Sequence, residues 1–302
     1  ADAIKFQTHY AEEESTLDEK FRIKFSYEDK SRYDYWKRME FDKNEWKELY
    51  DHAKDLGLIF LSSPFSNKSF EILNNIGIPA WKLGSGEFKS NSLLKKMVKS
   101  NKPILFSTGM SSMNEISRFY KFLKDQNSQF AIFQCTSQYP TKPSNVGLNL
   151  ITEFKKLFNV PIGLSDHTGE IFSPLAALSL GASIIEVHVT FNKQMFGPDN
   201  SSSIDIEDLS FLVNAKNEIF KYLSNPVDKD KMSLKLKNMR DIFSKSLTLS
   251  KNLKAGEIIK KEHLIEKKPG TGIPISKIND IVGKKLINDF DSRYLLKWSD
   301  FK

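Results

Sequence analysis

The sequence predicts an α/β protein whose main part is a (β/α)8 barrel, that is, a TIM barrel. Short runs of β-branched and aromatic residues recur about every 20 to 30 residues, and segments with helical spacing separate them. This alternation is typical of βα units that build a parallel sheet. The runs also end in polar groups, which suits a barrel because its strands all end at one mouth. An open doubly wound sheet is the alternative, but its single crevice would gather fewer of these polar ends.

Seven strands are expected in chain order. They cover residues 3–7, 58–64, 80–86, 103–109, 130–137, 160–167 and 183–190. Helical spacing is clearest over residues 44–56, 113–126 and 171–180. Because a closed barrel of this type has eight strands and no helix precedes the first run, we expect this chain to lack the first βα unit of its barrel.

The composition changes twice toward the C-terminus. Residues 1–224 are expected to form the barrel domain, and the lysine-rich residues 225–240 indicate a linker. Two short apolar runs, at 246–249 and 253–259, are followed by a Pro-Gly-Thr-Gly turn. This pattern predicts a small β-rich domain over residues 241–302.

The overall composition excludes several classes of protein. The net charge is +7, but the lysines are scattered and form no basic stripe with interleaved aromatics, so no nucleic-acid partner is expected. No apolar run reaches the roughly 20 residues of a membrane helix, so no membrane partner is expected either. The single cysteine, Cys135, rules out an internal disulfide and is typical of a reducing compartment, which predicts a cytoplasmic protein.

Two histidines predict a metal site. His167 and His188 lie at the ends of successive predicted strands, and neighbouring strands are about 4.8 Å apart. Two neutral imidazoles with open water positions suit a divalent ion such as Mn²⁺, Zn²⁺ or Co²⁺. The alternative is that backbone groups satisfy both rings. The other histidines, His9, His52 and His263, are expected to be surface or packing residues.

Two carboxylates accompany these histidines. Asp166 directly precedes His167, and we expect it either to orient that ring or to bind backbone amides of the following loop. Glu186 lies two residues before His188, so both side chains are expected on the same, inward face of their strand. A carboxylate in that position requires a partner.

A second set of strand-end residues suits a phosphate-bearing anion. Lysines supply positive charge, while hydroxyls and glycine-flanked amides donate hydrogen bonds. The members of this set are Lys5, Ser63, Lys82, Ser85, Ser107 and Ser137. Glu87 closes the Gly-Ser-Gly-Glu turn that begins at Gly84, and we expect it to relay a proton or to recognise a sugar hydroxyl.

Seven motifs follow one another along the chain. They are Lys5-Phe6-Gln7-Thr8, Ser63-Pro64-Phe65, Lys82-Leu83-Gly84-Ser85-Gly86-Glu87, Ser107-Thr108-Gly109-Met110, Cys135-Thr136 with Tyr139-Pro140, Gly163-Leu164-Ser165-Asp166-His167-Thr168 and Gly197-Pro198-Asp199. Together they resemble the bacterial sialic acid synthases, which make N-acetylneuraminate, legionaminate or pseudaminate. The C-terminal segment, with Lys268-Pro269-Gly270-Thr271-Gly272, resembles the antifreeze-like SAF domain of that family, which has a β-clip-like fold.

This resemblance implies a reaction, a cofactor and a partner. Sialic acid synthases condense phosphoenolpyruvate with an N-acetylated hexose, N-acetylmannosamine or a 2,4-diacetamido relative, to give a nonulosonic acid and phosphate. A divalent metal, Mn²⁺ before Mg²⁺ or Co²⁺, polarises the aldehyde of the open-chain sugar. The enzymes work as domain-swapped homodimers, in which the small domain of one subunit caps the barrel of the other.

The resemblance also implies roles for individual residues. Phosphoenolpyruvate would contact Lys5, Ser63, Lys82, Ser85, Ser107 and Ser137. The metal would be bound by His167 and His188. The acceptor sugar would contact Gln7, Glu87, Tyr139, Asp199 and, from the capping domain, Lys268. The expected catalytic residues are Lys82, Glu87 and His188.

Three of these positions depart from the family's usual residues. Ser63 replaces a threonine and keeps the hydroxyl, whereas Ser137 replaces an asparagine and loses an amide donor. Lys268 replaces an arginine, so bidentate binding of the acceptor is lost. The family's first βα unit, with its active-site glutamate, is expected to lie outside this chain.

Two other functions are alternatives at this point. One is a related phosphoenolpyruvate-dependent synthase of the 3-deoxy-octulosonate type, which uses a phosphorylated aldose and leaves the SAF-like segment without an explanation. The other is a non-catalytic sugar-binding barrel, against which the two lysines and two histidines of the predicted site argue.

Overall fold

A computed structural model of the chain describes residues 1–23 and 27–302. These residues form two compact units, Ala1–Ser224 and Asn225–Lys302.

The first unit contains one sheet of eight parallel strands, arranged in the order of the sequence. The strands are β1 (Ala3–Thr8), β2 (Ile59–Pro64), β3 (Trp81–Leu83), β4 (Ile104–Ser107), β5 (Phe130–Cys135), β6 (Ile162–Asp166), β7 (Ile184–Val189) and β8 (Ser203–Ile204). The parallel order in which each strand pairs with the next is that of a TIM barrel, so the predicted α/β barrel class is confirmed. Within the described residues no pairing joins β1 to β8.

The predicted strand count was one too low. The first seven strands match the predicted runs, with β1 extending one residue further, to Thr8. The eighth, β8, was missed because two residues are too few to show an alternating pattern. This short strand pairs only with the end of β7, where His188 lies opposite Ser203. The predicted strand at residues 80–86 is also shorter than expected, because a 3-10 turn, Ser85–Lys89, begins soon after β3.

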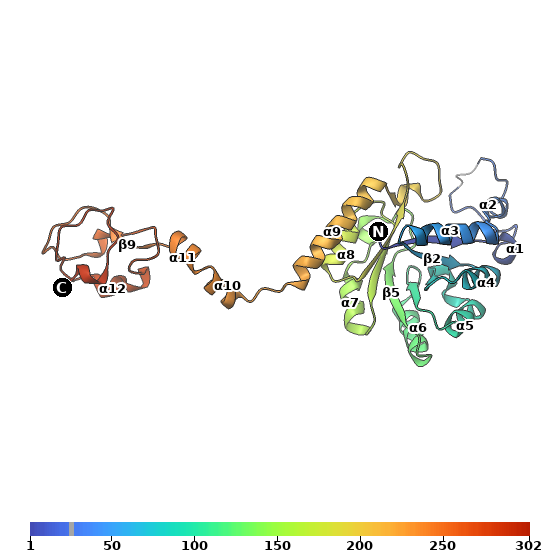
Figure 1. Cartoon of the computed structure of the whole chain (residues 1–302), viewed down its shortest axis with the longest axis horizontal. Coiled ribbons are helices and arrows are strands. Elements are labelled where there is room, and N and C mark those ends of the chain that lie inside the picture. The colour runs from blue at the N-terminus through green and yellow to red at the C-terminus, as the bar shows by residue number, and fades with distance from the viewer. Residues whose placement is uncertain (24–26) are drawn as a thin grey trace. The chain divides into compact units, whose positions relative to one another are not determined.

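Helices flank the sheet (Figure 1). They are α1 (Ala11–Glu14), α2 (Arg32–Arg38), α3 (Lys43–Asp55), α4 (Asn67–Ile76), α5 (Asn91–Lys99), α6 (Met113–Asp125), α7 (Asn149–Leu157), α8 (Phe172–Ser179) and α9 (Ile206–Ser224). The sequence fixes several starts through capping boxes, in which Asp42, Ser66 and Ser112 accept backbone hydrogen bonds at the first turns of α3, α4 and α6.

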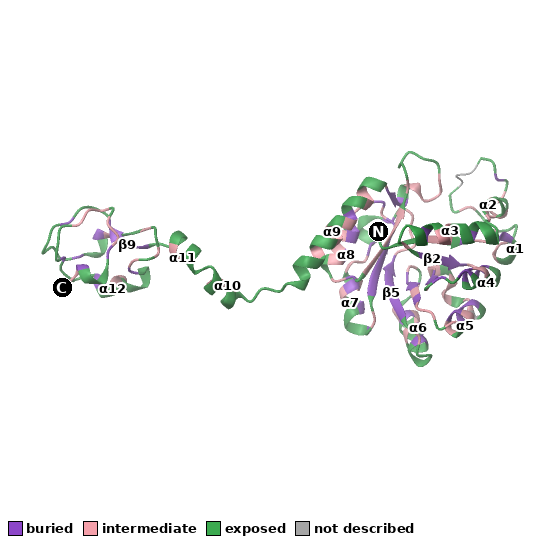
Figure 2. Ribbon diagram, in the orientation of Figure 1, coloured by how far each residue is buried: buried purple, intermediate pink, exposed green. Residues whose placement is uncertain are grey.

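The alternation along β3 separates the hydrophobic core from the polar interior of the sheet. Trp81 and Leu83 are buried on the helix side, and the ring of Phe70 in α4 stacks on Trp81 at a centroid distance of 4.5 Å. The residue between them, Lys82, therefore points to the opposite face. Figure 2 shows the strands as mostly buried and the outward helix faces as exposed. The strand positions that face away from the helices are therefore available to charged and hydroxyl side chains.

The second unit is small and has its own core. It contains α10 (Lys229–Lys235), α11 (Lys237–Phe243), β9 (Ser246–Leu249), β10 (Leu264–Lys267) and α12 (Ile278–Ile281). The strands β9 and β10 pair antiparallel, and Leu247, Leu249 and Leu286 are among the buried residues that pack together around them.

Two features of this unit were not expected from the sequence. The expected linker 225–240 contains helix α10 and most of α11. The run 253–259 forms no named strand, only isolated bridges from Leu253 to Phe290 and from Ile258 to Lys285. No helix in the described ranges of either unit is long and apolar enough to cross a membrane.

Gly163 in β6 is expected to tolerate no side chain. A Cβ atom there would lie 2.8 Å from the carbonyl oxygen of Ile184 and 2.9 Å from the ring of Phe133, so backbone and core would both have to shift. We expect Gly163→Ala to lower the free energy of unfolding by roughly 1–3 kcal/mol, the usual cost of overpacking. Urea denaturation followed by tryptophan fluorescence measures this. Gly197→Ala is the control, because nothing lies within 4 Å of its added Cβ, and equal losses in both variants would contradict the explanation.

Candidate active site

A buried ion pair crosses the interior of the sheet. Lys82 Nζ in β3 lies 2.8 Å from Glu186 Oε1 in β7 and donates a second hydrogen bond to Ser107 Oγ at 2.9 Å. Ser165 Oγ donates to the same Glu186 oxygen at 2.9 Å. Because β3 and β7 are not neighbours in the sheet, this contact is possible only if the sheet curls. The inward position predicted for Glu186 is confirmed.

A second lysine, Lys5, interacts electrostatically with the Glu186 carboxylate. Burial lowers the pKa of Lys5, and the Glu186 carboxylate counteracts this effect. Burial alone would raise the pKa of Glu186, but attraction to Lys5 and Lys82 and the hydrogen bonds from Lys82 and Ser165 hold it well below its usual range. Lys82 is paired with this carboxylate and Lys5 interacts with it electrostatically, so the interior carries basic groups that suit an anion.

Hydroxyl groups gather beside these lysines. Gly109 N–H donates to Ser85 Oγ at 3.0 Å. A Cβ atom at Gly109 would lie 2.8 Å from Ser85 Oγ and would clash with Ser137 Oγ, so the glycine is what allows both hydroxyls to approach. Ser107 is held by Lys82, as above. Ser63 is buried in β2, in register with Gln7 of β1.

The two imidazoles predicted to bind a metal lie side by side. Their ring centroids are 5.2 Å apart, and the ring of Tyr139 lies 4.3 Å from that of His167 and 6.0 Å from that of His188. With metal–nitrogen bonds of about 2.1 Å, two imidazoles on adjacent positions of one ion have centroids roughly 4.5 to 5.2 Å apart. The spacing therefore fits a shared ion.

The protonation of these rings also fits metal binding. Burial and the neighbouring His188 lower the pKa of His167 to about 4, and burial lowers the pKa of His188. Both rings are then neutral near pH 7, which is the form that binds metals. His167 Nδ1 lies 3.2 Å from the carbonyl oxygen of Thr136, a contact that directs Nε2 away from the backbone. Over the described ranges no cluster of three or more His, Cys, Asp or Glu side chains forms a metal site, so water and substrate oxygens would complete the coordination.

Asp166 has the second of its two expected roles, which is to bind the loop that follows it and not to orient the ring of His167. Its carboxylate accepts hydrogen bonds from the backbone N–H of Thr168 at 3.0 Å, from the Thr168 hydroxyl and from Ser173 Oγ at 2.6 Å. It thus fixes the loop after β6 and does not contact the ring of His167.

A cavity of about 520 Å³ opens next to these groups. Gln7, Glu87, Tyr139 and Asp199, the four residues predicted around an acceptor in this unit, all line it. Burial raises the pKa of the Tyr139 phenol, which therefore stays protonated. Arg22 also lines the cavity: it pairs with Asp199 at 2.5 Å, and its guanidinium lies 4.3 Å from the centroid of the Tyr139 ring.

Most of the remaining wall was not predicted from the sequence. The segment between β1 and α3 supplies His9, Glu13, Glu14, Glu19, Arg22, Arg32, Tyr35 and Trp36. This segment has no clear hydrophobic period, so no regular element could be predicted in it. The one sequence feature that pointed to a binding wall was its many charged and aromatic residues directly after the end of a strand. His9 does pack, between Trp36 and Phe65 at centroid distances of 3.9 and 4.3 Å, but it also lines the cavity.

Lys268, the acceptor contact expected from the capping domain, is not one of the site residues that lie together in the first unit. It belongs to the second unit, where it is exposed and its ammonium group lies 4.9 Å from the centroid of the Phe243 ring.

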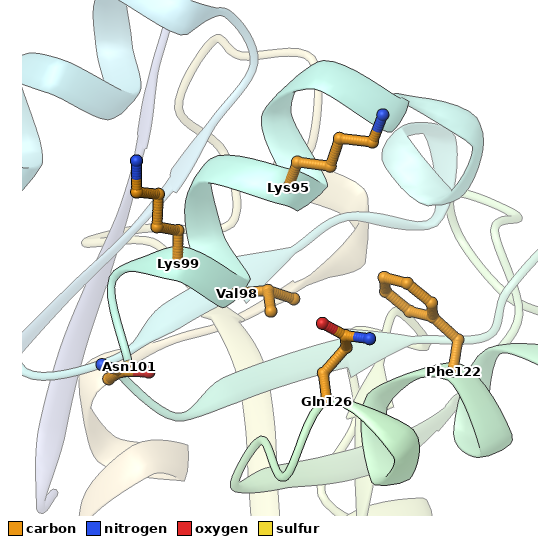
Figure 3. A pocket seen from close by; sticks show the side chains of 6 residues that line it. All are labelled: Lys95, Val98, Lys99, Asn101, Phe122 and Gln126. Carbon is orange, nitrogen blue, oxygen red and sulfur yellow. The ribbon is translucent and has the colours of Figure 1, made fainter.

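A second cavity, of about 620 Å³, lies between α5 and α6 (Figure 3). Its wall includes Lys95, Lys99, Phe122 and Gln126. Asn101, which also lines it, lies three residues before the start of β4, so this cavity is at the amino end of the strands. The predicted site residues are at the carboxyl ends, and none of them lines it.

Comparison with known proteins gives concordant matches for both units. The NeuB family model matches residues 1–228, and the SAF domain model matches residues 244–302. The N,N'-diacetyllegionaminic acid synthase of Campylobacter jejuni is 34% identical over 98% of this chain and 90% of its own length. The N-acetylneuraminate-9-phosphate synthase of Homo sapiens is 31% identical over 95% of this chain and 80% of its own.

A solved structure is similar as well. The N-acetylneuraminic acid synthetase of Leptospira borgpetersenii, crystallised with citrate, has a TM-score of 0.69 and 28% identity. The match covers 79% of this chain and 81% of that chain.

Glu87→Gln is expected to stabilise the protein at about pH 8. Burial and the nearby Glu14 carboxylate raise the pKa of Glu87 above its ordinary value of 4.5, so the ionised form is unfavourable in the folded state. That cost is absent at a pH below 4.5, where the carboxyl is protonated in both states, and complete above the raised pKa. Thermal unfolding should therefore show a higher Tm for the variant at about pH 8 and a difference that shrinks toward zero near pH 4. The exposed Glu153→Gln is the control, and an equal gain at both pH values would contradict the explanation.

Proposed function

The chain belongs to the NeuB family, and on that basis we propose that it condenses phosphoenolpyruvate with an N-acetylated hexose. The products are a nonulosonic acid and inorganic phosphate, and the reaction class is a transferase that forms a carbon–carbon bond. The observation that carries this proposal is the pocket in which Lys82 pairs with Glu186 and Lys5 interacts electrostatically with the same carboxylate. Beside it lie two imidazoles whose ring centroids are 5.2 Å apart. Synthases of such acids are among the relatives of this chain.

The cationic half of the site is suited to phosphoenolpyruvate. Lys5 and Lys82 are its basic groups, and Lys82 is paired with the Glu186 carboxylate. We assign the carboxylate and phosphate of this substrate to these ammonium groups and to the surrounding hydroxyls, because anionic oxygens accept charge-assisted hydrogen bonds from both kinds of donor. The hydroxyls come from Ser63, Ser85, Ser107 and Ser137.

We assign a divalent metal to His167 and His188. Mn²⁺ is preferred over Mg²⁺ because imidazole nitrogen favours softer ions than Mg²⁺, and Co²⁺ is the further alternative. When bound, the metal supplies Lewis-acid polarisation of the acceptor's aldehyde oxygen. The fit rests on the ring spacing and on the burial that keeps both imidazoles neutral.

The residues of the cavity hold the acceptor sugar. Gln7, Tyr139 and Asp199 line it and offer an amide, a protonated phenol and a carboxylate to sugar hydroxyls. Glu87 also lines the cavity, and its half-buried carboxyl with a raised pKa suits it to exchange a proton with the acceptor. The new bond joins the methylene carbon of phosphoenolpyruvate to the aldehyde carbon, water adds to the former enol carbon, and phosphate leaves.

A homodimer in which the second unit of one copy caps the site of the other is part of this proposal. It would bring Lys268 to the acceptor as a point charge. Large exposed apolar side chains on each unit support a partner surface: Phe220 and Tyr222 on the first unit and Leu234 on the second. We propose the cytoplasm as its location, because the one cysteine, Cys135, is a free, buried thiol.

The decisive experiment measures phosphate release from phosphoenolpyruvate with Mn²⁺. We expect release that requires N-acetylmannosamine or a 2,4-diacetamido hexose and that stops when a chelator removes the metal. In His188→Ala the rate should fall about 100-fold, the order of loss when a metal centre is disturbed. His52→Ala, an exposed substitution on α3, should keep the wild-type rate.

Two results would overturn the proposal. Release with a phosphorylated pentose but with no N-acetylated hexose would indicate a synthase of the octulosonate type. Absence of release with every sugar would indicate a barrel that binds sugars without catalysis.

A further inference from the structure

The positive charge of the chain is concentrated in its second unit. Residues 225–302 contain 18 lysine and arginine residues against 10 aspartate and glutamate residues, a formal charge of +8. The first unit, residues 1–224, has 27 against 28, a formal charge of −1. The net charge of +7 therefore comes from the small unit and not from the unit that holds the anion pocket.

Three extended segments of the second unit, at residues 256–260, 283–287 and 300–302, pair into a small ribbon. Ile258 is bridged to Lys285 in antiparallel orientation. On the other side, the backbone N–H of Lys285 donates to the carbonyl oxygen of Lys302 at 3.1 Å, and the N–H of Lys302 donates back at 3.0 Å. Residues directly opposite one another in antiparallel strands point to the same face of a sheet. Ile258, Lys285 and Lys302 therefore stand in one row.

The burial of alternate residues shows that this row lies on the outer face of the ribbon. Ile259 and Leu286 are 1% and 0% exposed and belong to the core of the unit. The neighbours that point the other way are exposed, 51% for Ile258 and 40% for Ile287. Side chains alternate along an extended strand, so Lys260 lies on the same face as Ile258. The outer face thus presents three lysines and two isoleucines, here called the basic face: Lys260, Lys285, Lys302, Ile258 and Ile287.

The charge of the basic face is not cancelled by carboxylates around it. In the part of the chain that the structure describes, none of its three lysines forms an ion pair. Asp300 is buried and accepts a backbone N–H at 2.7 Å, and Asp289 pairs with Lys254 at 2.8 Å. Glu262, in the turn that follows Lys260, is offset by the adjacent Lys261.

This mixture of side chains fits the surface of an anionic lipid membrane. Lysine ammonium groups are attracted to the phosphate groups of anionic lipids, and their flexible stems let them reach the head groups while aliphatic neighbours enter the interface. The two exposed isoleucines supply that aliphatic part. A nucleic acid is the less fitting partner, because it is typically bound by arginines and by aromatic rings on which bases stack, and the basic face has neither.

We propose that the second unit binds peripherally to an anionic lipid surface through the basic face. Such binding needs no spanning helix, so it revises the expectation of no membrane partner, which rested on the lack of a long apolar run. It is also independent of the proposed reaction. Lys268 follows β10 whereas Lys260 precedes it, so the basic face and the residue expected to cap an active site lie toward opposite ends of that strand.

Sedimentation of the full chain with lipid vesicles tests the proposal. We expect binding to vesicles of equal parts phosphatidylglycerol and phosphatidylcholine, no binding to phosphatidylcholine alone, and loss of binding as NaCl is raised. The double variant Lys260→Gln/Lys285→Gln should bind anionic vesicles about 30-fold more weakly, because each lysine near such a surface contributes roughly fivefold. The matched control is Lys245→Gln/Lys277→Gln, which removes the same charge from exposed positions outside the basic face; its affinity should fall less than about threefold.

A third variant tests the apolar part of the face. Ile258→Asn leaves the charge unchanged and should weaken binding to anionic vesicles about fivefold, because part of an exposed isoleucine no longer enters the interface. Its binding to a double-stranded oligonucleotide should equal that of the wild type. Circular dichroism of each variant checks that the second unit is folded.

Several outcomes would overturn the proposal. They are equal binding to neutral and anionic vesicles, no binding to anionic vesicles at low salt, and equal losses of affinity in the two lysine double variants. Tighter binding to the oligonucleotide than to vesicles, with no effect of Ile258→Asn on vesicle binding, would identify a nucleic-acid surface instead. Failure of the phosphate-release assay bears only on the proposed function, because vesicle binding is measured without substrates.

Discussion

The buried contact between Lys82 and Glu186 is the interaction on which the rest of the site depends. It joins β3 to β7 across the interior of the sheet at 2.8 Å, so it ties the curvature of the sheet to the chemistry of the site. Each partner requires the other: a buried carboxylate without cations, or two buried ammonium groups without a carboxylate, would carry a large desolvation cost. Lys5 interacts electrostatically with the same carboxylate, so Glu186 is the acidic group that both lysines of the site depend on.

Sequence reasoning located the parts of the site that strands carry. Lys82, His167 and Glu186 could be placed because side chains alternate along a strand and the ends of parallel strands converge, two regularities that hold without knowledge of the tertiary structure. For the same reason the order of the first seven strands followed from spacing alone. The short strand β8 could not be found, because its pairing with β7 is set by tertiary contact and not by a pattern within two residues.

The wall of the cavity lined by Gln7, Tyr139 and Asp199 could not be predicted from strand patterns. This wall comes largely from the segment between β1 and α3, where His9 stacks between Trp36 and Phe65 and where Arg22 reaches Asp199 across 177 positions of sequence. No periodic pattern encodes such contacts. The helices of the second unit were likewise hidden, since the lysines of α10 and α11 indicate an exposed surface whether or not the backbone is helical.

The anion pocket and the cavity wall are carried by different kinds of structure. The lysines and histidines stand on strands or directly at their ends, where a change of backbone would disturb the whole sheet, whereas Glu13, Glu14 and Arg22 stand on a connection between one strand and one helix. Substitutions in that connection can accumulate without disturbing the pocket for the shared donor substrate. Evolution can therefore change which sugar is accepted, through substitutions in this connection, while the strand residues that serve bond formation stay the same.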